Sequence, residues 1–443
     1  MRSKEIPRSE RLPSMKWSTV VAVAVMMPGL ALGEAEQGVP PAPPAPQALP
    51  APPRAPRVAR TARPRAAEQA PAAPGVVSRQ GDNWVEEVTG SAPAAPRIRV
   101  EVDTGAIDLR GAEQREVTYR VRRRVPASSE ENARRIFAMQ PVRAERHGDV
   151  LVLTIEPSHG RPLPADYQVT VPRGTSLSEL ETRAGLISAR DLDGSIRAET
   201  AGGAIDVDNI GGAVRLETIG GAITIGAVKG KVEAETAGGA IKLVSAGGDV
   251  RLVSQFGEIE VGRAGGSVRV ETAGGGIRIG TVAGDVFAET AGGNITVGEA
   301  GKVTVATAAG NIRVDHARLL LRAESAAGSI HLGRCAGPVR AETAAGSIQA
   351  VIAASRGAWA ESLLETAVGD ISVLVPRDLA MTIRAAVGMA GGQHRISTDL
   401  PLIQRGGPGP GPREISAEGA INGGGAPLRL RTVSGNIEIR SQK

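Results

Sequence analysis

The dominant pattern in the chain is an alternation of apolar and polar residues that glycine interrupts at regular intervals. A seven-residue motif of the type ETAGGAI recurs with a strict 18-residue spacing, and midway between its copies a second glycine is followed two residues later by Ile or Val. Each unit therefore divides into two halves, each with an alternating strand and a glycine turn. The strictly spaced copies begin at residues 181, 199, 217, 235, 253, 271 and 289.

This periodicity predicts an all-β fold, a parallel β-solenoid of about 18 residues per coil over residues 177–375. By the period-two rule, Ile205, Val207 and Leu216 point inward, and coils stacked about 4.8 Å apart form a rod on the order of 50 Å long. A rod of this kind has a narrow interior, which agrees with only 3 Trp, 2 Tyr and 3 Phe among 443 residues. Aromatic side chains normally fill large cores, so a conventional globular fold of this length is excluded.

A hydroxyl residue stands three positions before each motif glycine. Because side chains alternate between the two faces of a strand, this hydroxyl points inward, at a corner of the coil. There we expect it to form a hydrogen bond with a backbone group of the turn. A structural ladder of threonines and glycines is therefore predicted along the rod. It includes Thr200, Thr218, Thr236, Thr272, Thr290, Gly203, Gly221, Gly239, Gly275 and Gly293.

A second ladder, made of glutamates, lies one residue before the hydroxyls and points outward. Stacked like charges repel each other, and arginines two residues earlier on the same face offer ion pairs. Two interpretations stay open: a solvated, salt-bridged face, or a binding face for a cation or another ligand. The candidate binding face consists of Glu199, Glu217, Glu235, Glu271, Glu289, Arg197, Arg215 and Arg269.

Two less regular segments flank the repeats. Residues 77–176 alternate in several short runs and predict a strand-rich N-terminal cap with one short helix, for which Ser128 or Ser129 would be the N-cap residue. A cap is expected because the first coil of a solenoid otherwise presents an unpaired edge. Residues 376–443 are irregular until a single motif copy at the end, and this terminal repeat is expected to cover or complete the last coil.

The N-terminal residues predict export. Residues 1–33 resemble a signal peptide, because Lys16 precedes an apolar run that ends in small residues. The run is too short to span a bilayer, so no integral membrane span is expected after cleavage. Residues 34–76 are rich in Pro, Ala and Arg and predict a disordered linker, whose arginines are candidates for contact with anionic envelope polymers. The predicted location is the periplasm, the cell surface or the extracellular space.

The formal net charge of +5 does not indicate nucleic-acid binding. Residues 1–33 hold five basic residues against two acidic ones, and residues 34–76 hold five against three. The excess positive charge therefore lies entirely in these two segments, and the predicted folded part is neutral. With almost no aromatic residues for base stacking, no nucleic-acid partner is expected.

No metal, cofactor or catalytic residue is predicted. A single cysteine and five dispersed histidines contain no recognisable ligand spacing. The calcium-binding nonapeptide roll is excluded because its ligand column would contain Lys242 and Arg278. We therefore expect no enzymatic activity. A polysaccharide-active β-helix enzyme remains a remote alternative, and only residues 350–364 and 388–413 are irregular enough to build a cleft.

With these motifs in place, the chain resembles the bacterial "putative adhesin" family of β-strand repeat proteins, a domain of unknown function with T-x-x-G-x-I repeats. The resemblance rests on residues 167–187, on the motif copies and on the ending LRLRTVSGNIEIRS at 428–441. It implies an exported adhesin-like binding module without catalytic residues, whose partner is a surface or envelope component, either protein or glycan. The alternative function is a passive structural or envelope-stress scaffold.

Overall fold

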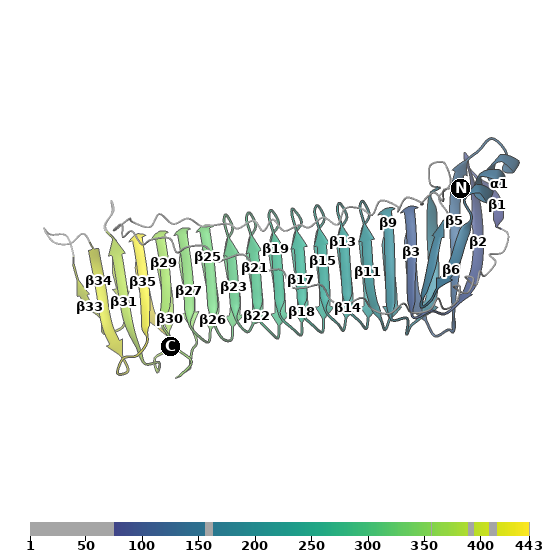
Figure 1. The fold of residues 1–443 in the computed structure, drawn as a ribbon. Coiled ribbons are helices and arrows are strands. Elements are labelled where there is room, and N and C mark those ends of the chain that lie inside the picture. Colours follow the sequence, from purple (N-terminus) through teal and green to yellow (C-terminus); the bar gives the residue numbers. More distant parts are fainter. Residues whose placement is uncertain (1–74, 156–162, 356, 389–393, 407–413, 443) are drawn as a thin grey trace, which may run out of the picture.

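The computed structural model describes residues 75–155, 163–355, 357–388, 394–406 and 414–442. Within these residues, two long sheets of 18 strands each lie face to face and form a straight rod (Figure 1). The expected signal peptide lies outside the described residues, as does the expected linker except for its last two residues. Most of the glycine- and proline-rich loop at 405–413 also lies outside them.

Sheet A receives one strand from every coil. In spatial order, it contains β6 (Val142–His147), β7 (Val150–Ile155), β3 (Arg97–Thr104), β9 (Leu177–Ala184), β11 (Ser195–Thr200), β13 (Val214–Thr218), β15 (Val232–Thr236), β17 (Val250–Ser254), β19 (Val268–Thr272), β21 (Val286–Thr290), β23 (Val303–Thr307), β25 (Leu321–Ala327), β27 (Val339–Ala345), β29 (Ser362–Val368), β35 (Pro427–Ser434), β31 (Met381–Gly388), β34 (Glu414–Ile421) and β33 (Ile403–Arg405).

Sheet B receives the other strand of every coil. In spatial order, it contains β1 (Val76–Gln80), β2 (Asn83–Pro93), β5 (Glu116–Pro126), β8 (Ala165–Pro172), β4 (Ile107–Ala112), β10 (Ile187–Leu192), β12 (Ile205–Ile210), β14 (Ile223–Val228), β16 (Ile241–Ala246), β18 (Ile259–Ala264), β20 (Ile277–Val282), β22 (Ile295–Ala300), β24 (Ile312–Ala317), β26 (Ile330–Cys335), β28 (Ile348–Ile352), β30 (Ile371–Val375), β36 (Ile437–Ser441) and β32 (Ile396–Thr398).

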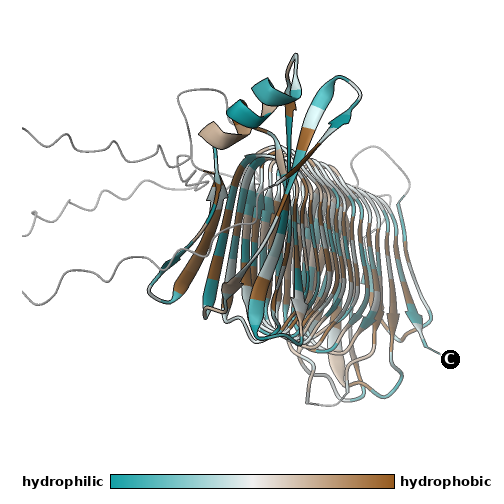
Figure 2. Ribbon diagram, turned by 90° about the vertical axis from the view of Figure 1, so that its right-hand side faces the viewer, coloured by the Kyte–Doolittle hydropathy of each residue, from teal (hydrophilic) through white to brown (hydrophobic). Residues whose placement is uncertain are grey.

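The predicted parallel β-solenoid is confirmed. Successive strands of each sheet pair in parallel with an offset of one coil, so that Ile205 lies beside Ile223 in sheet B and Leu216 beside Ala234 in sheet A. At about 4.8 Å per coil, the ladder from β3 to β31 spans roughly 60 Å. Figure 2, viewed along the rod, shows the coils stacked behind one another.

The core is a thin layer between the two sheets. Along β12, Ile205, Val207 and Ile210 are buried, whereas Asp206 and Asp208 between them face outward. The same alternation in every coil produces one continuous apolar cluster that runs from Ala92 to Ile439. Because Val, Ile, Leu and Ala dominate this layer, the two sheets approach closely, and few aromatic side chains fit between them.

At the N-terminal end, the solenoid begins earlier than residue 177. Strands β3 and β4 form a complete coil, which pairs in parallel with β9 and β10 of the next coil. The chain then leaves the rod and returns with β7 and β8, which add one parallel strand to the outer side of β3 and β4. The antiparallel strands β1, β2, β5 and β6 lie outermost and close both sheets.

The one helix among the described residues, α1 (Glu130–Met139), belongs to this closed end. Ser129 is its N-cap, and the Ser129 hydroxyl accepts a hydrogen bond of 3.3 Å from the backbone N–H of Asn132. Ala133 and Phe137 are buried in a small cluster with Val125. Helix α1 therefore packs beside the antiparallel strands as part of the cap.

At the C-terminal end, the terminal repeat lies one coil further inside than expected. Strand β35 lies between β29 and β31, and β36 lies between β30 and β32. The chain thus leaves one coil position empty after β30, builds the outermost strands, and fills the empty position with its last residues. The outer edge of sheet A is closed by the antiparallel pairs β31–β34 and β33–β34 instead.

Candidate binding face

The hydroxyl ladder lies at the corner that follows each strand of sheet A. From Thr182 onward, the hydroxyl of each ladder residue donates to the motif glycine carbonyl of the preceding coil, and in most of these coils it also accepts from the motif glycine N–H of its own coil. For Thr236, these hydrogen bonds measure 3.0 Å to the Gly221 carbonyl and 3.2 Å from the Gly239 N–H. The other predicted ladder threonines, Thr200, Thr218, Thr272 and Thr290, make both hydrogen bonds as well.

Glycine is required at this corner because successive coils touch there. A Cβ atom on Gly203 would lie 1.6 Å from the carbonyl oxygen of Gly185, and one on Gly221 would lie 1.8 Å from that of Gly203. Any side chain would therefore push adjacent coils apart. The corner column is a structural device, and it holds sheet A in the strict register on which the outer face depends.

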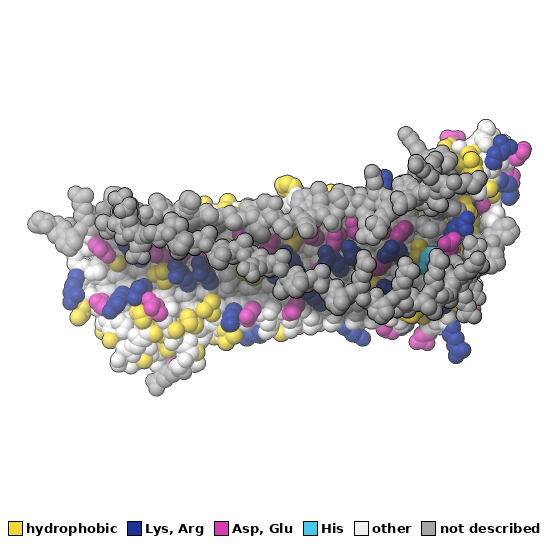
Figure 3. Space-filling model, viewed as in Figure 1, with side chains coloured by type: hydrophobic (Ala, Val, Ile, Leu, Met, Phe, Trp, Pro, Cys, Tyr) yellow, Lys and Arg dark blue, Asp and Glu magenta, His cyan; other side chains and the backbone are white. Residues whose placement is uncertain are grey.

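The glutamates of the candidate face are stacked in register on the outer surface of sheet A. Glu181, Glu199, Glu217 and Glu235 lie beside one another on β9, β11, β13 and β15. Beyond a break at Val253, Glu271 and Glu289 are also neighbours. Figure 3 shows acidic and basic side chains alternating along the visible part of this face.

Ion pairs connect the arginine column to part of the glutamate column. Arg215 lies 2.8 Å from Glu217 and 3.3 Å from Glu233 of the next coil, and Arg269 lies 2.6 Å from Glu271. Within the described residues, Arg197 makes no ion pair. The face therefore has two kinds of position, some already neutralised and others available to a partner.

Three glutamates of the face have a raised pKa. Burial raises the pKa of Glu199, Glu235 and Glu289, and a neighbouring glutamate adds to each shift. Arg197 lowers the pKa of Glu199 and Arg251 lowers that of Glu235, and Arg215 adds to both effects, but burial raises each pKa by more. These carboxylates carry negative charge at a cost in free energy that an approaching cationic group would relieve.

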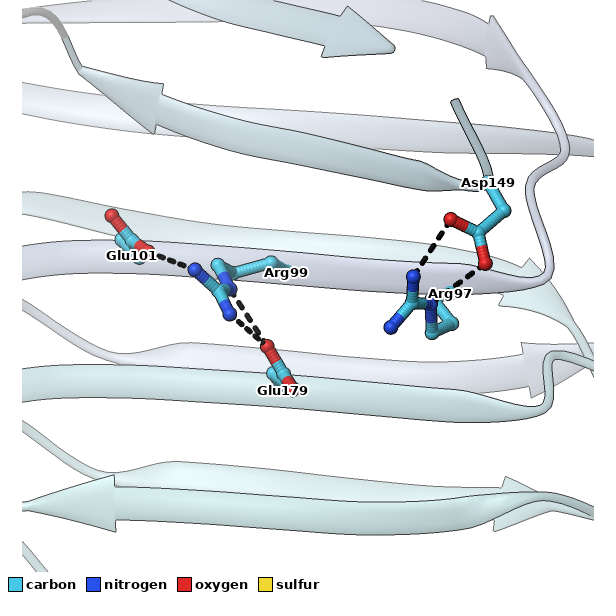
Figure 4. A network of polar contacts seen from close by, with 5 residues as sticks. All are labelled: Arg97, Arg99, Glu101, Asp149 and Glu179. Atoms are coloured by element: carbon cyan, nitrogen blue, oxygen red, sulfur yellow. Dashed lines mark hydrogen bonds and ion pairs between the residues drawn. The ribbon is translucent and has the colours of Figure 1, made fainter. Parts of the chain in front are cut away.

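The columns extend further than the sequence predicts. Arg99 of β3 binds Glu179 of β9 at 2.5 Å and contacts Glu101 at 3.5 Å, while Arg97 lies 2.7 Å from Asp149 (Figure 4). Sequence reasoning missed Arg97, Arg99 and Glu101 because they lie on β3, in a coil that the 18-residue spacing does not mark. The run TGAI at 104–107 carries the motif glycine and isoleucine and was the available signal.

Two shallow grooves lie on the same face. One, with a volume of about 270 Å³, is bordered by Arg215, Glu217, Glu235 and Arg251. The other, of about 380 Å³, lies next to it and contains Phe287, an aromatic residue that the sequence prediction did not single out. The residues that line each groove come from different coils, and the parallel register of sheet A brings them together.

The irregular stretches supply structural contacts. The indole N–H of Trp359 donates to the Ala426 carbonyl at 3.2 Å, and Nε2 of His394 lies 3.4 Å from the Ser434 hydroxyl. Cys335 is buried in sheet B, and burial raises its pKa to about 12. Among the described residues, no three His, Cys, Asp or Glu side chains converge as metal ligands, and no helix has the length and apolarity to cross a membrane.

No family model matches the chain, and no curated protein matches it. Among solved structures, one described as a "putative cell adhesion protein" from Clostridium sporogenes is 8% identical and covers 80% of this chain and 99% of that chain, with a TM-score of 0.16. A "putative adhesin" from Bacteroides fragilis is 11% identical and covers 80% of this chain and 97% of that chain, with a TM-score of 0.18. Likenesses this low carry no functional argument.

Proposed function

We propose that the chain is an exported, adhesin-like binding protein of the cell envelope or cell surface. The observation that carries this proposal is the candidate binding face, a straight array of in-register Glu and Arg side chains on sheet A. A face on which charged residues recur from coil to coil suits a partner that is itself extended and repetitive. The motif resemblance and the predicted export signal support the same function.

The partner belongs to the surface or the envelope and is a protein or a glycan. Charged side chains that are half-exposed keep the face soluble and offer hydrogen bonds and ion pairs at regular intervals. Absence of catalysis is part of the proposal. Trp359 and His394, which lie in the two irregular stretches, have backbone or side-chain partners that account for their positions.

The test is retention of the full chain on immobilised glycans and envelope proteins. Specific, saturable retention is expected, and it should weaken in an Arg215→Glu, Glu217→Arg double variant, which swaps one ion pair of the face. Lys242→Glu with Glu260→Lys is the matched control, since this ion pair of 3.4 Å lies on sheet B.

Each outcome of the retention test decides one part of the proposal. Absence of retention on every surface would overturn the binding function and favour the scaffold alternative. Equal loss in both swapped variants would show that the outer surface of sheet A is not the binding face. Release of shortened glycan from the immobilised material would overturn the non-catalytic part.

A further inference from the structure

We propose that the larger groove on sheet A binds an acidic oligosaccharide. This inference rests on the proposed binding function and specifies a site and a ligand class for it. The groove has a volume of about 380 Å³ and runs along the rod from β15 to β23. Val250, Val268 and Val286, one residue from each of three adjacent coils, lie beneath it, and their side chains point into the core.

An aromatic ring stands at one side of this groove. Phe287 lies in register between Arg269 and Thr304. The guanidinium of Arg269 covers the ring at 4.1 Å from its centroid, whereas the neighbour on the other flank is the short side chain of Thr304. Phe287 therefore rises above the residue beside it and offers an apolar surface to a ligand. Sugar rings carry apolar C–H faces that pack on such surfaces.

Two of the four cations that line the groove, Arg251 and Lys302, have only long ion pairs, whereas Lys231 and Arg269 are paired closely with glutamates. Arg251 has Glu271 at 3.9 Å and Lys302 has Asp285 at 3.9 Å, and the two basic side chains are 51% and 59% exposed. Asp249 accepts from the Ser267 N–H at 2.8 Å, and Asp285 accepts from the Lys302 N–H at 2.9 Å. These carboxylates already accept backbone hydrogen bonds, whereas Arg251 and Lys302 keep exposed N–H donors, which a carboxylate of a ligand can accept from.

The spacing of these groups matches a short linear ligand. Arg251 lies on β17 and Lys302 immediately precedes β23, so three coil spacings separate them, roughly 14 Å along the rod. Phe287, on β21, lies between the two cations. A short oligosaccharide with carboxylates on its sugars can place one ring on Phe287 and an acidic group near each cation.

Peptide recognition fits this groove less well. An extended peptide usually adds to an exposed sheet edge, but the strands beneath the groove are paired on both sides, as β19 is with β17 and β21. A helix needs a wide apolar groove, and here the single ring of Phe287 lies among charged side chains. A sugar ring offers an apolar C–H face to Phe287, and a carboxylate on it accepts hydrogen bonds from the cations at the border.

The experiment measures binding of a fluorescent oligogalacturonate of uniform length to the full chain at low and high salt. A fully methyl-esterified oligomer of the same length and a poly-glutamate peptide are compared with it. We expect the acidic oligosaccharide to bind best and its affinity to fall with salt. Phe287→Ala and Arg251→Gln should each weaken binding about tenfold. The matched control is Phe256→Ala, since Phe256 is 72% exposed and lies on a turn outside the groove.

Equal binding of the methyl-esterified oligomer, preference for poly-glutamate, or absence of oligogalacturonate binding would overturn the ligand class. Equal affinity of the groove variants and the wild type, or an equal loss in Phe256→Ala, would overturn the site. These failures are separate from failure of the proposed function. A chain that is still retained on other surfaces keeps its binding function, whereas a chain that is retained on none loses both.

Discussion

The hydroxyl ladder allows a quantitative prediction at Thr236. Thr236→Val keeps the side-chain shape but removes the donor to the Gly221 carbonyl and the acceptor for the Gly239 N–H. Thr236 is 2% exposed, so water replaces these partners poorly. Each lost bond costs about 1 to 2 kcal/mol, and the added methyl recovers less than about 1 kcal/mol. The variant should therefore lose about 2 to 3 kcal/mol of unfolding free energy.

The control is Thr236→Ser, which keeps both hydrogen bonds and removes one methyl group at a cost of about 1 kcal/mol. Serine occupies the same position natively at Ser254 and Ser325, with hydrogen bonds of 3.1 and 3.0 Å to the preceding glycine carbonyl. Guanidinium unfolding followed by circular dichroism, with hydrogen exchange at the Gly239 amide, measures both variants. If Thr236→Val is as stable as Thr236→Ser, the ladder does not stabilise the fold in this way.

Four further predictions follow from the same geometry. Ile223→Asp should lower the melting temperature sharply because it buries a charge, while outward Thr224→Asp should be nearly neutral; equal effects would contradict the alternation. Glu235→Gln should stabilise the protein by less than about 1 kcal/mol at pH 7, because burial and Glu217 raise the pKa of Glu235 and make its charge unfavourable. As the pH falls through that raised pKa toward the unfolded value of 4.5, the native state takes up the proton and the advantage of the variant in denaturant titrations should disappear; a constant advantage would refute the charge explanation. Neither calcium nor a chelator should shift the melting temperature, and unfolding by a chelator would reveal a metal requirement. Deletion of residues 427–443 should release β31 and β34 from the rod and leave the central coils folded, as hydrogen exchange would show; unchanged protection at β31 would contradict the observed strand order.

The fold was predictable where sequence spacing and spatial spacing coincide. The 18-residue period places Ile205 beside Ile223 and Glu199 beside Glu217. Residues 18 positions apart in the sequence are therefore neighbours in a sheet, and this rule predicts both sheets and their outer columns. The 18-residue rule does not identify the coil formed by β3 and β4. Val102 replaces the hydroxyl in it, and the residues of the cap separate it from the next coil, so no 18-residue interval marks it.

The ends were harder to predict because a chain can leave a coil position empty and fill it later. Pairing of β35 with both β29 and β31 depends on contacts between residues more than 40 positions apart, and the local pattern of residues 428–441 is the same in either location. The groove had a usable signal, since Arg269 and Phe287 are 18 residues apart. The sequence does not show that the short side chain of Thr304 lies beside Phe287, or that the ion pair of Arg251 is long; both come from the structure.

The buried position of the final coil determines how the protein responds to mechanical tension. A force on the C-terminus acts on β36, which is hydrogen-bonded along one edge to β30 and along the other to β32, so two ladders must shear together before the strand moves. A force on the N-terminal side acts on β1, whose one strand partner among the described residues is β2, so this pair can unzip one bond at a time. Under load, the rod should therefore yield first at its N-terminal end and hold at its C-terminal end.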